Sequence, residues 1–295
     1  MNAHRPARAR AGFRIALYVL VGVLFAIGTA LAVGEFRWRG ITRQRLARLD
    51  ALRQAPEPAS YSEAELEGLP APVQRYFRAA LRDGQPIIAR ARLTQRGEIL
   101  LGEAEDGWRP FTATQTFSPR PPGFLWDARG QAAPGMSVYV HDAYIGGEGV
   151  LQGALLGLVT VVDMSGTPEV AEGELMRYLA EGVWIPTALL PSQDVRWEPM
   201  DDERARATLV DGETSVSLVF TFGADGLVSS VFAGARPRDV GGETVPTPWE
   251  GRFGDYVERD GMRIPTSGEV EWQPEGRSLP YWRGHIIDVA YEYAR

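Results

Sequence analysis

The chain has 295 residues, an apolar content of 44% and a formal net charge of −7, which fits a globular protein rather than a disordered one. It contains no cysteine, and all 31 basic residues are arginine, which excludes disulfides, thiolate chemistry and lysine-based mechanisms. Ten arginines against Glu35 and Asp50 give residues 1–54 a charge of +8 and leave −15 for the remainder, too acidic for a nucleic-acid partner.

A basic tail at residues 1–14 precedes an uncharged apolar run at residues 15–34. A helix of that length can cross a hydrocarbon core about 30 Å thick. The alternative is a cleaved signal peptide, which the preceding arginines and the small residues Ala30 and Ala32 fit. The run is longer than the roughly 7–15 apolar residues typical of a signal peptide. We therefore favour a single-pass transmembrane anchor.

Arginines flank the run on both sides, four before it and six within residues 37–53. Counted strictly, the positive-inside rule would keep the C-terminal domain in the cytoplasm. Long translocated domains escape that count, and a single N-terminal anchor most often exports the domain after it, so we expect an extracytoplasmic domain. Residues 41–53 have apolar side chains at near-helical spacing, which predicts that the helix continues. The alternative is a basic patch on anionic lipid headgroups.

Beyond the anchor, we interpret residues 35–68 as an Arg-rich stalk and linker, and residues 69–295 as an antiparallel β-domain. One-sided apolar spacing predicts a helix over residues 71–82. A second predicted helix begins after the N-cap Thr167 and ends at Gly182. The proline-bounded apolar segment 184–191 is too short to cross a membrane. We expect it to fill the concave side of a curved sheet.

From Ile87 onward the apolar pattern has a period of two, most clearly over Ser215–Phe222, which is typical of a sheet with one buried face. Asp-Gly pairs at residues 211–212, 225–226 and 260–261 indicate hairpin turns. We expect roughly ten strands. The predicted fold is mainly β with a few helices (α+β): a large curved antiparallel sheet or half-barrel with helices packed on its concave side, preceded by one N-terminal transmembrane helix.

The sequence contains none of the common hydrolase, zinc-protease or phosphate-loop motifs. His141 and Asp142 are adjacent, so on a strand they point to opposite faces. We expect His285 to share a face with Ile287 and Val289 and to be structural. A carboxylate-based hydrolase would need two acids brought together across the fold, for example Asp142 with Glu174. We expect no cofactor and no metal site.

An apolar ligand has more support. Residues 150–162 carry no charge, and we interpret them first as a buried strand pair and alternatively as the wall of an apolar pocket. Together with the apolar faces of the second helix and the segment after it, they supply the candidate ligand-binding residues, namely Leu155, Leu158, Met176, Leu179, Trp184, Leu189 and Trp197.

Three stretches, Leu69–Leu81, Gly173–Ser192 and Pro248–Trp272, resemble an uncharacterised bacterial family of membrane-anchored proteins, a domain of unknown function. The hairpin Tyr256–Trp272 is also similar to one in periplasmic lipoprotein carriers of the LolA/LolB type. That superfamily wraps a curved antiparallel sheet around helices and holds acyl chains inside. The resemblance implies a lipid ligand and a place at the bacterial inner membrane, within the cell envelope.

Three functions therefore stand as hypotheses. The first is a membrane-tethered domain, a binding protein in preference to an enzyme, that holds a lipid or other apolar ligand and so has a concave apolar cavity. The second is an envelope hydrolase that uses carboxylates or His285, in which His141, His285 and at least two acids meet in one cleft. The third is an interaction module without a small-molecule site, marked by an exposed apolar or sheet-edge surface instead of a pocket. The oligomeric state is left open.

Overall fold

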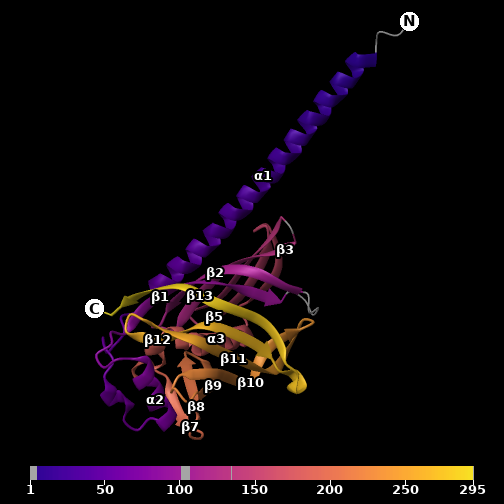
Figure 1. The fold of residues 1–295 in the computed structure, drawn as a ribbon. Coiled ribbons are helices and arrows are strands. Elements are labelled where there is room, and N and C mark those ends of the chain that lie inside the picture. Colours follow the sequence, from indigo (N-terminus) through magenta and orange to yellow (C-terminus); the bar gives the residue numbers. More distant parts are fainter. Residues whose placement is uncertain (1–4, 101–106, 134, 295) are drawn as a thin grey trace.

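The computed structural model describes residues 5–100, 107–133 and 135–294. Within them, thirteen strands form one antiparallel sheet in the order β6-β5-β4-β3-β2-β1-β13-β12-β11-β10-β9-β8-β7, and the sheet curls around its helical contents (Figure 1). In chain order the strands are β1 (Ile88–Leu100), β2 (Trp108–Ser118), β3 (Gly123–Ala133), β4 (Met136–Ile145), β5 (Glu148–Leu155), β6 (Val159–Ser165), β7 (Arg196–Pro199), β8 (Arg204–Asp211), β9 (Thr214–Phe222), β10 (Val228–Val240), β11 (Glu243–Arg259), β12 (Met262–Trp272) and β13 (Leu279–Tyr293).

The first and last strands pair with each other at the middle of the sheet, with Ala91 opposite Tyr291. The meander β1–β6 extends to one edge and the meander β7–β13 to the other. Between those edges the chain crosses the concave face as helix α3 (Pro168–Glu181), followed by three short 3₁₀ turns. These turns are η3 (Gly182–Trp184), η4 (Pro186–Leu189) and η5 (Pro191–Gln193).

The Asp-Gly pairs form the predicted hairpin turns between β8 and β9, β9 and β10, and β11 and β12. At the last of these, Asp260 and Gly261 both have positive φ, 48° and 82°. Two consecutive residues with positive φ are typical of the tight turn that matches the twist of a hairpin. The expected curved antiparallel sheet is therefore confirmed, with thirteen strands in the described residues rather than roughly ten.

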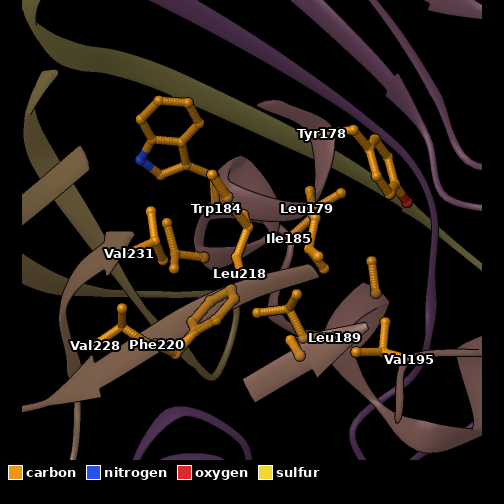
Figure 2. Packing of buried hydrophobic residues seen from close by; sticks show 14 of the residues in the cluster. Tyr178, Leu179, Trp184, Ile185, Leu189, Val195, Leu218, Phe220, Val228 and Val231 are labelled. Atoms are coloured by element: carbon orange, nitrogen blue, oxygen red, sulfur yellow. The ribbon is translucent and has the colours of Figure 1, made fainter. Parts of the chain in front are cut away.

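The concave side of the sheet holds the main core. Thr167 caps α3 by accepting a hydrogen bond from Val170 N at 3.3 Å, and Gly182 ends the helix, as predicted. Side chains of α3 and of the turns after it meet Leu218 and Phe220 of β9 (Figure 2). The proline-bounded segment therefore fills the concave side, because its apolar side chains are removed from water only there.

A smaller helical layer closes one end of the sheet. It contains the 3₁₀ turn η1 (Glu63–Leu66) and helix α2 (Ala71–Ala80). Tyr76 and Phe77 of α2 are fully buried in the core. Leu81 is already extended, so the helix ends two residues before the predicted end. A further 3₁₀ turn, η6 (Pro274–Gly276), connects β12 to β13.

Helix α1 (Arg5–Leu52) is continuous from the basic tail through the apolar run and beyond it. One helix in the described residues is therefore long and apolar enough to cross a membrane. Its C-terminal part lies along the outer face of the sheet while the rest projects away from the domain (Figure 1). The predicted continuation of the helix over residues 41–53 is confirmed as far as Leu52, where α1 ends.

The part of α1 that lies beyond the apolar run contacts the sheet through one stripe, Glu35, Trp38, Thr42, Arg45 and Leu49, which we call the docking face of α1. Its spacing of three and four residues places these side chains on one side of the helix. Trp38 is 1% exposed and Leu49 is 3% exposed. The stripe therefore seals a second, smaller core on the side of the sheet opposite α3.

Most arginines after the apolar run contact the domain. Arg37 donates to the carbonyl of Leu158 at 3.4 Å, Arg48 pairs with Glu148 at 2.6 Å, and Arg53 pairs with Glu292 at 2.9 Å. The opposite charges of the N-terminal segment and the remaining domain thus meet directly. For these residues the contact with the protein replaces the alternative of a patch facing lipid headgroups.

Two sequence expectations are wrong in detail. Strand β6 is an edge strand on which Val159 and Val161 are 61% and 50% exposed, so residues 150–162 do not form a fully buried pair. In β13, a bulge at Ile287 reverses the alternation of side chains. Ile287 is therefore exposed with His285 while Val289 packs against the core.

Candidate functional site

An enclosed cavity of about 90 Å³ lies between α3 and the sheet, and it adjoins a second cavity of about 300 Å³. Asp142, Arg236 and Tyr281 line both of them. The two cavities together fall in the size range of small-molecule sites, about 300–1,000 Å³. Most of the walls come from inward-facing residues of strands that are distant in the sequence.

Aromatic rings dominate the wall of the smaller cavity. They come from the strands β3, β11 and β13 and from the 3₁₀ turn η3. On a strand, side chains point alternately to the two faces of the sheet. The rings are Trp126, Trp184, Trp249, Phe253, Tyr281 and Trp282. Gly268 of β12 adds no side chain, and a Cβ there would lie 3.4 Å from Trp282 and 3.8 Å from Trp184. This glycine therefore keeps space open between two indole rings.

Arg177 of α3 forms a buried ion cluster at one wall. Its guanidinium donates to Asp142 and, through Nε, to Glu181 Oε1 at 2.9 Å. It also lies over the rings of Phe124 and Trp126, at 5.1 and 5.0 Å. Burial alone would lower the pKa of Arg177, but the two carboxylates outweigh it and raise that pKa. Arg177 is thus positively charged, and the carboxylates of Asp142 and Glu181 compensate its charge.

Arg236 of β10 lies at the junction of the two cavities and is 8% exposed. Its guanidinium is held between Trp249 and Trp272, with centroids 5.0 and 5.4 Å away. It donates to Gly173 O at 3.1 Å and to the Tyr281 hydroxyl at 3.2 Å. Among the described residues, no carboxylate lies within 4.0 Å of this guanidinium. Its hydrogen-bond partners are all neutral, and the carboxyl group of Glu174 interacts with it electrostatically without an ion pair.

Glu174, on the turn of α3 that faces Arg236, is 7% exposed. Burial, reinforced by the nearby charge of Asp142, raises the pKa of Glu174 well above 4.5. Its Oε2 has no hydrogen-bond partner, and neither have Asp142 Oδ1, Trp184 Nε1 and Trp282 Nε1. Buried polar atoms without partners are rare and costly, and these four belong to residues around the same two cavities.

A larger hollow of about 740 Å³ opens on the sheet beside β1, β12 and β13. His285 lines it, and so does the exposed ion pair of Arg283 with Glu98. The hollow is more open to solvent than the two cavities beside α3. We therefore place the candidate site in those two cavities rather than in this larger hollow.

The two histidines of the domain do not meet the buried acids. His141 is fully buried on the outer face beneath α1, and His285 is exposed. Asp142 points to the concave side, opposite its neighbour His141, as alternation predicts. The convergence of both histidines with two acids, which the hydrolase hypothesis requires, does not occur. Within the described ranges no cluster of three or more histidines or acids is arranged to hold a metal ion.

The residues predicted to bind a ligand lie in three places. Trp184 lines the cavity. Leu155 and Leu158 flank the turn between β5 and β6, where Leu158 approaches Gly34 of α1. The others are packed in the core beside the cavity, and they are Met176, Leu179, Leu189 and Trp197. The structure thus brings five of the seven to the concave side and one of them to the cavity wall.

Two arginines at the site were not predicted from the sequence. Arg177 lies on the inward side of α3 and Arg236 at an inward position of β10, and a charged residue at a predicted core position is the signal that could have found both. Asp142 and Glu174, named as an example of two acids brought together across the fold, do line a common cavity. Their charges interact there.

A family model for a family of unknown function, DUF6544, matches residues 59–284. The chain belongs to this family. Its membership confirms the predicted resemblance to a family without an assigned function. No curated protein matches the sequence.

Two solved structures are similar in their arrangement of strands. One is a LolA superfamily protein from Nitrosomonas europaea, with 11% identity, a TM-score of 0.34, and coverage of 84% of this chain and 93% of the other. The second is a β-barrel-like protein of the DUF1849 family from Brucella abortus, with 13% identity, a TM-score of 0.21, and coverage of 70% and 99%. Scores this low carry no functional argument, so function is argued from the cavities alone.

Proposed function

We propose that this protein is a membrane-tethered binding domain that holds a lipid-like or other largely apolar ligand in the aromatic cavity between α3 and the sheet. The observation that carries the proposal is the cavity wall of six aromatic rings, in which Gly268 leaves space between two indole rings. An apolar ligand gains free energy there by leaving water. Neither histidine of the described domain lines these two cavities or contacts their acids, which favours binding over hydrolysis there.

The tether is the second part of the proposal. Helix α1 has no break between the apolar run and its docking face, which supports an uncleaved anchor. A Cβ at Gly34, the last residue of the run, would overlap the carbonyl oxygen of Leu156. The turn between β5 and β6 therefore lies beside the end of the apolar run. We place that turn, with the exposed Val159 and Val161, at the membrane surface.

We place the domain on the extracytoplasmic side of a bacterial inner membrane, because a single N-terminal anchor most often exports the domain after it. The apolar ligand would then come from the adjacent membrane. Such a location fits a domain whose cavity is concave, aromatic and close to the bilayer.

Filling the cavity tests the binding function. Gly268→Leu would place a side chain between Trp184 and Trp282, and we expect it to abolish quenching of tryptophan fluorescence by 1-octanol. Gly234→Leu on β10 is the matched control, since a Cβ there meets only Phe232 at 3.9 Å. Equal quenching in both folded variants would contradict the cavity as the binding site.

The absence of cysteine permits single-cysteine labelling of the tether. A fluorophore at Val23→Cys should be quenched by lipid-attached quenchers, one at Val161→Cys more weakly, and one at Val210→Cys on β8 not at all. All three side chains are at least 45% exposed. An unquenched label at Val23 would contradict the anchor. In spheroplasts, failure of a membrane-impermeant maleimide to react at Val210→Cys would contradict export.

A further inference from the structure

The junction of the two cavities contains a buried cation without a counter-ion among the described residues. A charge removed from water is costly unless it is paired, and Arg236 has only a carbonyl, a hydroxyl and two indole rings as partners there. The nearby Arg177 differs, because Asp142 and Glu181 compensate it. Arg236 therefore lacks a negatively charged ion-pair partner at this junction.

Hydrogen-bond donors gather around the same point. The Tyr281 hydroxyl accepts from Arg236 Nη1 at 3.2 Å and from Trp249 Nε1 at 2.9 Å, so its own proton remains free to donate. The indole N–H groups of Trp184 and Trp282 are buried without acceptors. These three neutral donors line the same cavity as a guanidinium that has no carboxylate within ion-pair distance.

We infer that the polar end of the ligand is an oxyanion of the carboxylate or phosphate class, bound by Arg236 and Tyr281 at the junction of the cavities, with its apolar part along the aromatic wall. This inference rests on the proposed function, and it narrows the ligand to an amphipathic anion. Charge-assisted hydrogen bonds from a guanidinium to an oxyanion are among the strongest in proteins.

A cationic ligand fits this geometry less well. The carboxylates of Asp142 and Glu181 already receive hydrogen bonds from Arg177. Around these cavities the carboxyl oxygens without a partner are Asp142 Oδ1 and Glu174 Oε2. One hydroxyl on the ligand, such as that of a monoprotonated phosphate, would satisfy the first of them.

The test compares four octyl compounds that differ in their head groups, with the full chain in phosphatidylcholine nanodiscs. Octyl phosphate and octanoate should bind at least about tenfold more tightly than 1-octanol, and octyltrimethylammonium more weakly than all three. Inorganic phosphate and acetate, which lack the chain, should bind at least about tenfold more weakly than their octyl forms. Tryptophan fluorescence and calorimetry report the affinities.

Arg236→Gln should remove the preference for octyl phosphate over 1-octanol, while Arg206→Gln, which deletes an exposed arginine on β8, should retain it. If Arg236→Gln does not fold, Tyr281→Phe and Arg236→Lys serve instead. Tyr281→Phe should weaken the binding of octyl phosphate and octanoate but not that of 1-octanol, and Arg236→Lys should retain part of the preference for anions.

The outcomes separate the two proposals. Equal binding of 1-octanol and octyl phosphate, unchanged by Arg236→Gln, overturns the oxyanion site but leaves the apolar cavity intact. Failure of every octyl compound to bind overturns both. Tightest binding of the ammonium compound, or equal binding of inorganic and octyl phosphate, overturns the amphipathic anion.

Discussion

Arg45 of α1 donates to Nδ1 of His141 on β4, with 2.5 Å between the two nitrogens. Because arginine only donates, Nδ1 accepts and the proton of a neutral His141 lies on Nε2, which is 2.8 Å from Thr42 Oγ1. The ring also stacks on Trp38 at 4.1 Å. The helical segment beyond the apolar run is therefore fixed to the sheet by a buried polar network.

This network makes the docking of α1 dependent on pH. Burial lowers the pKa of His141 below 6.5, and Arg45 adds to the effect, although Asp127 opposes it. The unfolded chain thus binds the proton more readily, and stability falls as pH drops from about 6.5 toward the folded-state pKa. His141→Gln should lower Tm near pH 7.5, and the gap to wild type should narrow as the pH approaches about 5.

His285→Gln is the matched control for that experiment. His285 is exposed on the outer face of the sheet, so its replacement should shift Tm little and equally at both pH values. A gap between His141→Gln and wild type that stays constant with pH would show that folding does not shift the pKa of His141.

Gly34 should tolerate no side chain. A Cβ there would overlap Leu156 O and crowd Leu158, so Gly34→Ala must push the β5–β6 turn away from α1, at a cost of about 1–3 kcal/mol in the free energy of unfolding. Gly28→Ala lies on the same helix with nothing within 4 Å of its Cβ and should leave stability unchanged. Circular dichroism in denaturant measures both, and equal stabilities would contradict the close contact.

The ion cluster of Arg177 should be a strong determinant of stability. Arg177→Leu strands two buried carboxylates, and breaking a buried pair in this way costs about 3–5 kcal/mol. Arg204 pairs with Asp201 at 2.7 Å on the surface, and Arg204→Leu should have no measurable effect because exposed pairs are screened by water. Chemical denaturation distinguishes the two, and similar losses would mean that burial does not set the strength of the Arg177 cluster.

Glu174 should reduce stability as the pH rises. Burial and Asp142 raise its pKa above 4.5, so the folded state holds a proton that the unfolded state releases, and stability is lost as pH increases through that window. Glu174→Gln keeps the shape of the neutral acid and does not titrate. Its Tm relative to wild type should increase from about pH 4.5 to about pH 8.

Glu213→Gln is the control for that experiment, because Glu213 lies at an exposed turn. The Tm of this variant relative to wild type should not increase with pH as that of Glu174→Gln does. If Glu174→Gln and Glu213→Gln respond alike to pH, folding does not raise the pKa of Glu174.

The candidate site was predictable only in part. Trp184 was identified because it lies in a proline-bounded apolar segment that must be buried. Arg177 and Arg236 are separated by 59 positions in the sequence, and no local pattern indicates that they line adjoining cavities. The bulge at Ile287 was also not predictable from the sequence. The strand pairing shifts there, but the alternation of residue types along the sequence continues without a break.

Local patterns of the sequence by themselves determined the elements. An uncharged run at residues 15–34 makes a long helix, and two-residue alternation with Asp-Gly turns makes an antiparallel sheet, because both depend on neighbours along the chain. The tertiary structure decided what those elements enclose. The docking of α1 on β3–β5 and the unpaired charge of Arg236 depend on contacts between distant residues, whose burial sets the strength of each charge and hydrogen bond.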